Sequence, residues 1–277
     1  MRSFSQLEKK ELKIYPKKRL SQHFLTNLNA ARRIVEYLDL KPGQKVLEIG
    51  PGKGVLTKYL LEKAEKVFGV ELDSNLCKYL EEKFKDSENL EVINQDILNY
   101  DLKKVAKKEG SLKVIGNLPY KVTTPILEYL IQNRELIELA ILTVQKEVAK
   151  RICAKPGTSE WSPLSIGVQL FSNPELLFIL KPNSFHPPPK VYSAVIRIEF
   201  LQNPKVEVEF PFFSNLVKAL FSCRRKNLLN GLSKALSWDK KKVKTLLEEA
   251  GIEDRRRGET LSLEELANLA RLISGKI

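Results

Sequence analysis

Asn117, Leu118, Pro119 and Tyr120 are consecutive residues that together could hold an amino group on a planar base. The asparagine amide oxygen and the carbonyl of the residue before proline are two hydrogen-bond acceptors, and the tyrosine ring is a stacking surface. The exocyclic amine of adenine is a poor nucleophile, so an enzyme that alkylates it must hold both N–H groups while the nitrogen becomes more tetrahedral. The alternative is an ordinary turn, since Asn and Pro are common turn residues.

A glycine-rich stretch, with Gly50, Gly52 and Gly54, could approach a ligand with its backbone. The dinucleotide fingerprint GxGxxG/A would place a small residue where this chain has Val55, and this difference argues against NAD or FAD. On its own, such a loop is equally compatible with a structural turn.

Three polar residues close apolar segments that follow the glycine loop. Glu71 can accept hydrogen bonds from both hydroxyls of a ribose, Asp96 from an adenine amino group, and Asn117 closes the next segment. Because the carboxyl ends of parallel strands share one crevice, we expect these residues and the glycine loop to converge on one ligand.

The elements that must position these residues alternate between strands and helices. We expect strands at 45–50, 66–72, 90–96, 112–117 and 137–144, and helices at 26–40, 55–64, 74–84, 124–133 and 145–154, with Asn27 or Asn29 capping the first helix and Ser74 the third. This alternation predicts an α/β fold with a mostly parallel sheet. Segments 175–182 and 193–200 have only a proline-rich connection between them, which predicts an antiparallel pair at the sheet edge.

The end of the chain has helical periodicity at 211–222, 225–237, 239–250 and 262–273. We therefore expect two domains: residues 1–204, including a basic N-terminal arm, and a small all-α domain of residues 205–277.

Charge is concentrated at the two ends of the chain. The formal net charge is +13; residues 1–45 hold 11 Lys and Arg against 4 Asp and Glu, and residues 201–277 hold 15 against 10. Basic flanks around a near-neutral middle favour a polyanionic partner. The three cysteines form no CxxC pair, and neither a membrane-spanning run nor a signal-peptide pattern is present, so we expect a cytoplasmic protein without a metal or membrane partner.

The combination of EIGPGKG, Glu71, Asp96 and NLPY resembles the S-adenosylmethionine-dependent methyltransferases of Rossmann-like fold. Three further stretches, KKRLSQHFLTN (17–27), FHPPPKVYSAV (185–195) and FSCRRKNLLNGL (221–232), resemble the rRNA adenine N6,N6-dimethyltransferases. The resemblance extends over roughly residues 15–275.

The resemblance implies that the cofactor is S-adenosylmethionine, and it assigns roles to individual site residues. The cofactor would be bound by His23, Leu25, Gly50, Gly52, Glu71, Leu72, Asp96, Ile97 and Asn117. The target adenine would be held by Asn117, Leu118, Pro119, Tyr120 and Phe185, and RNA by Lys17, Lys18, Arg19, Arg224, Arg225 and Lys226. His23 departs from the asparagine usual in the family, and Phe185 has the alternative of a core anchor beneath the proline-rich loop.

Within the family, one group, the kasugamycin-sensitivity methyltransferases, dimethylates two adjacent adenosines near the 3′ end of small-subunit rRNA. A second dimethylates one large-subunit adenosine. NLPY together with FSCRRK favours the first group, which implies an enzyme acting on a (pre-)30S particle in ribosome biogenesis. We expect a monomer, since the sequence has no coiled-coil pattern and no long apolar edge. The alternatives are the large-subunit enzyme, a non-catalytic RNA-binding assembly or transcription factor, and an adenine DNA methyltransferase.

Overall fold

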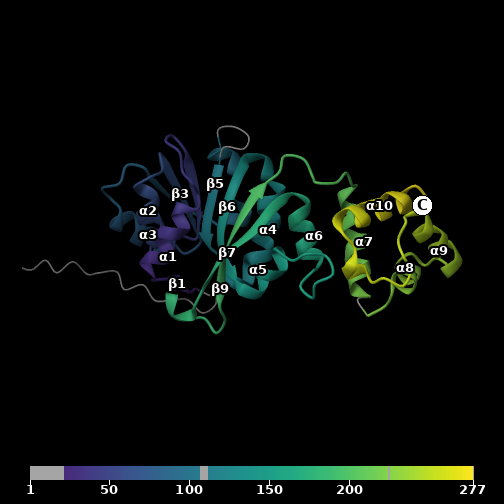
Figure 1. Cartoon of the computed structure of the whole chain (residues 1–277). Coiled ribbons are helices and arrows are strands. Elements are labelled where there is room, and N and C mark those ends of the chain that lie inside the picture. The colour runs from purple at the N-terminus through teal and green to yellow at the C-terminus, as the bar shows by residue number, and fades with distance from the viewer. Residues whose placement is uncertain (1–21, 107–111, 224, 277) are drawn as a thin grey trace, which may run out of the picture.

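The computed structural model describes residues 22–106, 112–223 and 225–276. A seven-stranded sheet with the order β4-β3-β2-β5-β6-β9-β7 forms its centre (Figure 1). The strands are β2 (Lys45–Ile49), β3 (Lys66–Glu71), β4 (Leu90–Asn94), β5 (Leu112–Asn117), β6 (Ile137–Gln145), β7 (Ser172–Leu180) and β9 (Ser193–Phe200). Strands β2 to β6 are parallel, whereas β9 runs antiparallel to both β6 and β7. The expected mostly parallel sheet with an antiparallel pair at its edge is confirmed.

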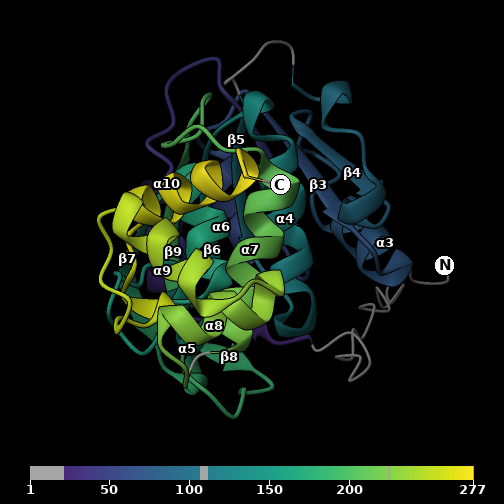
Figure 2. The same ribbon diagram turned by 90° about the vertical axis from the view of Figure 1, so that its right-hand side faces the viewer.

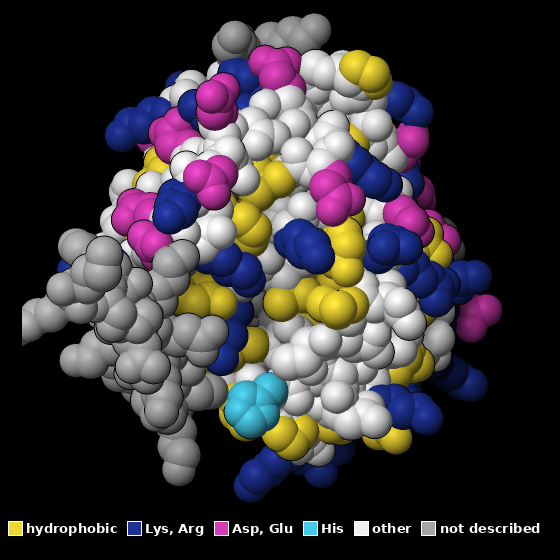
Figure 3. All heavy atoms as spheres, turned by 90° about the vertical axis from the view of Figure 1, so that its left-hand side faces the viewer, with side chains coloured by type: hydrophobic (Ala, Val, Ile, Leu, Met, Phe, Trp, Pro, Cys, Tyr) yellow, Lys and Arg dark blue, Asp and Glu magenta, His cyan; other side chains and the backbone are white. Residues whose placement is uncertain are grey.

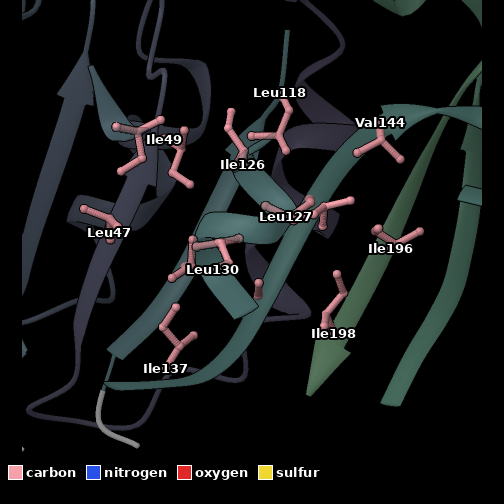
Figure 4. Packing of buried hydrophobic residues seen from close by; sticks show 14 of the residues in the cluster. Leu47, Ile49, Leu118, Ile126, Leu127, Leu130, Ile137, Val144, Ile196 and Ile198 are labelled. Atoms are coloured by element: carbon pink, nitrogen blue, oxygen red, sulfur yellow. The ribbon is translucent and has the colours of Figure 1, made fainter. Parts of the chain in front are cut away.

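Helices cover both faces of this sheet, which explains why its central strands are continuous apolar runs. The helices are α1 (Leu28–Glu36), α2 (Val55–Leu61), α3 (Ser74–Lys83), α4 (Thr123–Gln132), α5 (Lys146–Ile152) and α6 (Pro163–Leu170). Successive strand residues alternate between two cores: Val46 and Ile115 pack with α1 and α2, and Leu47 and Val114 pack with α4. Figure 4 shows the second core, with Leu47 on its strand and Ile126, Leu127 and Leu130 on α4. The two cores hold the carboxyl edge of the sheet rigidly.

Four helices, α7 (Phe210–Ser222), α8 (Leu228–Leu236), α9 (Lys240–Glu249) and α10 (Leu263–Ser274), follow the sheet. They lie at the end of the molecule opposite α1–α3 (Figures 1 and 2). Their apolar core includes Trp161 and Ile166, and the Trp161 indole N–H donates to the Leu261 carbonyl at 3.1 Å. This core therefore includes residues from before position 204, and the expected domain boundary there stays a prediction.

Short elements complete the described part of the chain. A separate two-stranded sheet pairs β1 (Phe24–Leu25) with β8 (Phe185–His186) in antiparallel register. The 3-10 helices are η2 (Ile97–Asn99), η3 (Leu102–Lys104), η4 (Tyr120–Val122), η5 (Arg134–Leu136), η6 (Pro182–Ser184) and η7 (Gly258–Thr260). Across residues 22–106, 112–223 and 225–276, no helix is long and apolar enough to cross a membrane.

Several local expectations differ from the structure. Asn27 caps α1 as expected, accepting from the Ala30 N–H at 3.0 Å, but α3 is capped by Asp73 rather than Ser74, because the Asp73 carboxylate accepts from the Asn75 N–H at 3.1 Å. Helix α8 begins at Leu228 rather than at 225. Helix α6 and the β1–β8 pair had not been predicted.

Candidate active site

A cavity of about 220 Å³ opens at the carboxyl ends of β2, β3 and β5. Four segments line it, and they contribute Gln22, His23 and Phe24, then Gly50 and Gly52, then Glu71, Leu72 and Leu76, and finally Asn117 to Val122. The predicted convergence of the glycine loop, Glu71 and Asn117 is present in this cavity. The segment 22–24 reaches it because β1 pairs with β8.

The glycine loop has the backbone conformation that only glycine adopts readily. Gly50 has φ +64° and Gly52 has φ +58°. A Cβ on Gly52 would lie 3.0 Å from Cδ1 of Phe24, so a side chain there would displace the ring that packs against the loop. A Cβ on Gly50 would meet nothing within 4 Å, and Gly50 lines the cavity. The loop therefore presents bare backbone to a ligand.

Glu71 ends β3 and is almost completely buried, with 6% of its surface exposed. Its Oε2 accepts from the Gly52 N–H at 3.1 Å, and its Oε1 accepts from the Asp73 N–H at 2.9 Å. Burial raises the pKa of this carboxyl, while the two backbone N–H groups oppose part of that rise. These bonds fix the carboxylate at the cavity, and each oxygen retains capacity to accept from a ligand hydroxyl.

Asn117 ends β5, and its amide has a defined orientation. The Nδ2 group donates to the His23 carbonyl at 2.8 Å, so Oδ1 is the atom that remains to accept a hydrogen bond. The next residue is fixed as well: the Leu118 N–H donates to the Thr143 carbonyl at 3.0 Å, and its side chain is buried. The carbonyl of Pro119 accepts from the Val122 N–H at 3.1 Å and closes the turn.

Tyr120 lies against His23, with ring centroids 5.6 Å apart and an interplanar angle of 26°. The Tyr120 hydroxyl is 2.7 Å from the Ser193 Oγ, and burial raises the pKa of this phenol. The His23 Nδ1 is 2.7 Å from the carbonyl of Pro187. Because a carbonyl only accepts, Nδ1 carries the hydrogen. His23 thus joins the proline-rich loop to the tyrosine, and its own carbonyl orients Asn117.

A second, buried carboxylic acid lies behind the glycine loop. Glu48, on β2, is 1% exposed and accepts from the Thr57 hydroxyl at 2.7 Å. Burial raises the pKa of this carboxyl from 4.5 to about 7, and the nearby Glu71 adds to the rise. Glu48 borders a smaller cavity of about 30 Å³ that also contacts Leu25, Gly50 and Asn117.

Three predicted site residues line neither of these cavities, and their roles stay predictions. The Asp96 carboxylate caps η2 by accepting from the Leu98 N–H at 3.0 Å. Asp96 lies near the end of β3, because the N–H of the preceding residue, Gln95, donates to the Glu71 carbonyl. Ile97 is buried in the core. Phe185 is only 3% exposed and packs in the core shared by α1 and α2, which fits the anchor alternative; its stacking role stays a prediction.

The predicted RNA-binding residues are only partly described. Lys17, Lys18, Arg19 and Arg224 lie outside the described residues, whereas Arg225 and Lys226 are exposed between α7 and α8. Within the described chain, no group of three or more His, Cys, Asp or Glu side chains could hold a metal ion.

Sequence reasoning missed Phe24 and Ser193, and also the cavity-lining residues Gln22, Leu76, Lys121 and Val122. Phe24 packs against the glycine loop, and Ser193 is the hydrogen-bond partner of Tyr120. Both residues lie inside the stretches QHFL and VYSAV, which resemble family motifs. The sequence therefore indicates that these stretches matter, but it does not show which contacts Phe24 and Ser193 make.

A family model described as ribosomal RNA adenine dimethylase matches residues 15–269. The chain is 44% identical to ribosomal RNA small subunit methyltransferase A of Alkaliphilus metalliredigens over 264 residues, which is 94% of this chain and 92% of that protein. It is 41% identical to the protein of the same name from Geobacter metallireducens, over 93% of this chain and 95% of that one.

Two solved structures are similar in fold and sequence. A dimethyladenosine transferase from Plasmodium falciparum has a TM-score of 0.78 and 27% identity, covering 92% of this chain and 98% of its own. The 23S rRNA methyltransferase ErmE has a TM-score of 0.72 and 27% identity, covering 91% of this chain and 99% of its own.

Proposed function

We propose that this chain, which belongs to the ribosomal RNA adenine dimethylase family, converts two adjacent adenosines near the 3′ end of small-subunit rRNA to N6,N6-dimethyladenosine. It is an S-adenosylmethionine-dependent rRNA adenine dimethyltransferase. The observation that carries the proposed chemistry is the Asn117 amide, whose nitrogen is bound to the His23 carbonyl and whose oxygen is left to accept from the substrate amine.

The residues lining the cavity fit the cofactor. Glu71 would hold the ribose hydroxyls, and the bare backbone at Gly50 and Gly52 would lie against the methionine part. Leu72, 53% exposed, would cover one face of the adenine, and Asp96 would accept from its amino group. When bound, S-adenosylmethionine supplies an electrophilic methyl group on a sulfonium.

The clamp around the substrate amine needs no strong base. Asn117 Oδ1 accepts one N–H, and the Leu118 carbonyl accepts the other, which directs the nitrogen lone pair toward the cofactor side of the cavity. As positive charge develops on the nitrogen, both acceptors become stronger partners, and the surplus proton passes to solvent after the transfer. After the first methylation one N–H remains, so one acceptor suffices to orient the amine for the second.

Binding of rRNA is supported by the formal net charge of +13 and by exposed basic side chains. Figure 3 shows the face of the molecule that carries α1–α3, where Lys and Arg side chains lie among hydrophobic and acidic ones. At the other end of the molecule, Arg225 and Lys226 are exposed. Phosphate neutralisation by such residues makes binding salt-dependent. We further propose that the protein acts as a monomer in the cytoplasm, on a (pre-)30S particle.

Two observations favour the small subunit over the large one. The relatives named as small-subunit methyltransferases are 40–44% identical, whereas the 23S rRNA methyltransferase ErmE is 27% identical. The choice is tested by incubating the protein and labelled S-adenosylmethionine with small subunits from a strain lacking this methylation, and with large subunits in parallel. Mass spectrometry should find dimethyladenosine in the 3′ fragment of the small-subunit rRNA. Label only on large-subunit RNA would overturn the proposal.

A further inference from the structure

An aromatic residue outside the cavity is exposed close to the clamp. Tyr192 has 48% of its surface exposed, and the preceding Val191 has 40%. The Lys146 ammonium lies 5.5 Å from the centroid of the Tyr192 ring, within the range of a cation–π contact. Neither side chain lines the cavity described above, so the clamp chemistry leaves this pair unused.

The backbone holds this tyrosine in a fixed position. Its carbonyl accepts from the Lys146 N–H at 2.9 Å. The next residue, Ser193, pairs with Gln145 in the β6–β9 register, and its hydroxyl is 2.7 Å from that of Tyr120. Tyr192 is therefore one residue away from a direct partner of the clamp tyrosine, and little ordering entropy would be lost when a ligand stacks on it.

The chain segments that contain the clamp and Tyr192 are basic. Segments 118–127 and 181–192 contain no Asp or Glu, and they carry the exposed Lys121, Lys181 and Lys190. Glu147 is the acidic residue adjacent to Lys146 in the chain. An exposed ring among lysines is the combination that binds single-stranded nucleic acid, where bases stack on aromatic rings and ammonium groups contact phosphates.

We propose that Tyr192 and Lys146 form a subsite for the nucleotide next to the target adenosine. This inference rests on the proposed function. An adenosine that enters the clamp leaves the stack of its own strand, so the neighbouring base loses a stacking partner. Tyr192 replaces that partner, and Lys146 contacts an adjoining phosphate. The subsite thereby holds the RNA strand in register while the adenine amine lies at Asn117.

The test compares Tyr192→Leu with Tyr192→Phe in steady-state methylation of undermethylated small subunits. Leucine keeps the apolar volume and removes the aromatic face, so KM for the subunit should rise about tenfold while kcat stays within about twofold of wild type. Phenylalanine keeps the face and should leave KM unchanged. Phe210→Leu is the matched control, because Phe210 is 45% exposed on α7 and should not affect KM.

A binding measurement separates this subsite from the proposed function. Affinity for a 3′ fragment of small-subunit rRNA is measured over a range of salt, with thermal unfolding confirming that each variant is folded. Lys146→Gln should reduce the slope of log affinity against log salt by about 1. The subsite is overturned if Tyr192→Leu binds and methylates as wild type does, or if Tyr192→Phe loses as much as Tyr192→Leu. Failure of wild type to methylate would instead overturn the function, and the binding data would still decide the subsite.

Discussion

Replacing the buried Glu48 by glutamine should stabilise the protein above neutral pH. The carboxyl has an ordinary pKa of 4.5 in the unfolded chain, and burial raises its pKa to about 7 in the fold. Between these values the folded protein binds more protons than the unfolded chain, so the free energy of unfolding falls as pH rises through that interval. Across this pH interval the free energy of unfolding falls by about 3 kcal/mol, and the fall is complete above pH 7.

Glutamine keeps an oxygen that accepts from the Thr57 hydroxyl but carries no charge. Urea unfolding followed by circular dichroism should find Glu48→Gln more stable than wild type by about 3 kcal/mol at pH 8, and within about 1 kcal/mol of it at pH 5. The exposed Glu62→Gln is the control and should retain the wild-type pH profile. A Glu48→Gln protein that is less stable than wild type at pH 8, or whose stability changes with pH in parallel with wild type, would refute the assignment of a carboxylate destabilised by burial.

Gly50→Ala should lower Tm by several degrees in scanning calorimetry, because a φ of +64° costs an L-residue about 1–2 kcal/mol; an unchanged Tm would contradict this strain. Titration calorimetry of the same variant should find weaker S-adenosylmethionine binding. Ser193→Ala removes the hydrogen-bond partner of the Tyr120 hydroxyl and should lower the free energy of unfolding by about 1 kcal/mol, and Tyr120→Phe should lower it by a similar amount. The double variant should lose no more than either single variant, whereas additive losses would count against a hydrogen bond between the two residues. Replacing Arg225 and Lys226 by Gln should weaken rRNA binding and reduce its salt slope by about 2 in filter-binding assays; an unchanged slope would remove both residues from the RNA interface.

The parallel sheet and the cavity could be predicted because their signals are local. Apolar runs separated by helical periodicity determine βαβ order, and that order places the glycine loop, Glu71 and Asn117 at one sheet edge. The residue types then indicate the chemistry. By contrast, a two-residue strand such as β1 has no periodicity, so the hydrogen bond from the Asn117 amide to the His23 carbonyl could not be inferred from the chain.

Features that depend on distant partners were missed or left open. Helix α6 is short and apolar around most of its circumference, and its packing against α7 is what identifies it. The bond between Trp161 and the Leu261 carbonyl joins segments far apart in sequence. Asp96 caps η2 by accepting from the Leu98 N–H, and its contact with the ligand stays a prediction, because a carboxylate can accept both bonds.

The most direct test of the clamp is single-turnover methyl transfer by Asn117→Ala, with S-adenosylmethionine affinity measured on the same sample. Because the wild-type amide is held by the His23 carbonyl with its oxygen free for the substrate amine, transfer should fall by about a hundredfold or more. Cofactor affinity should change much less, since Asn117 is one of nine predicted cofactor-binding residues and Glu71 and the glycine loop are untouched. An Asn117→Ala protein that binds the cofactor and transfers methyl groups at the wild-type rate would contradict the clamp.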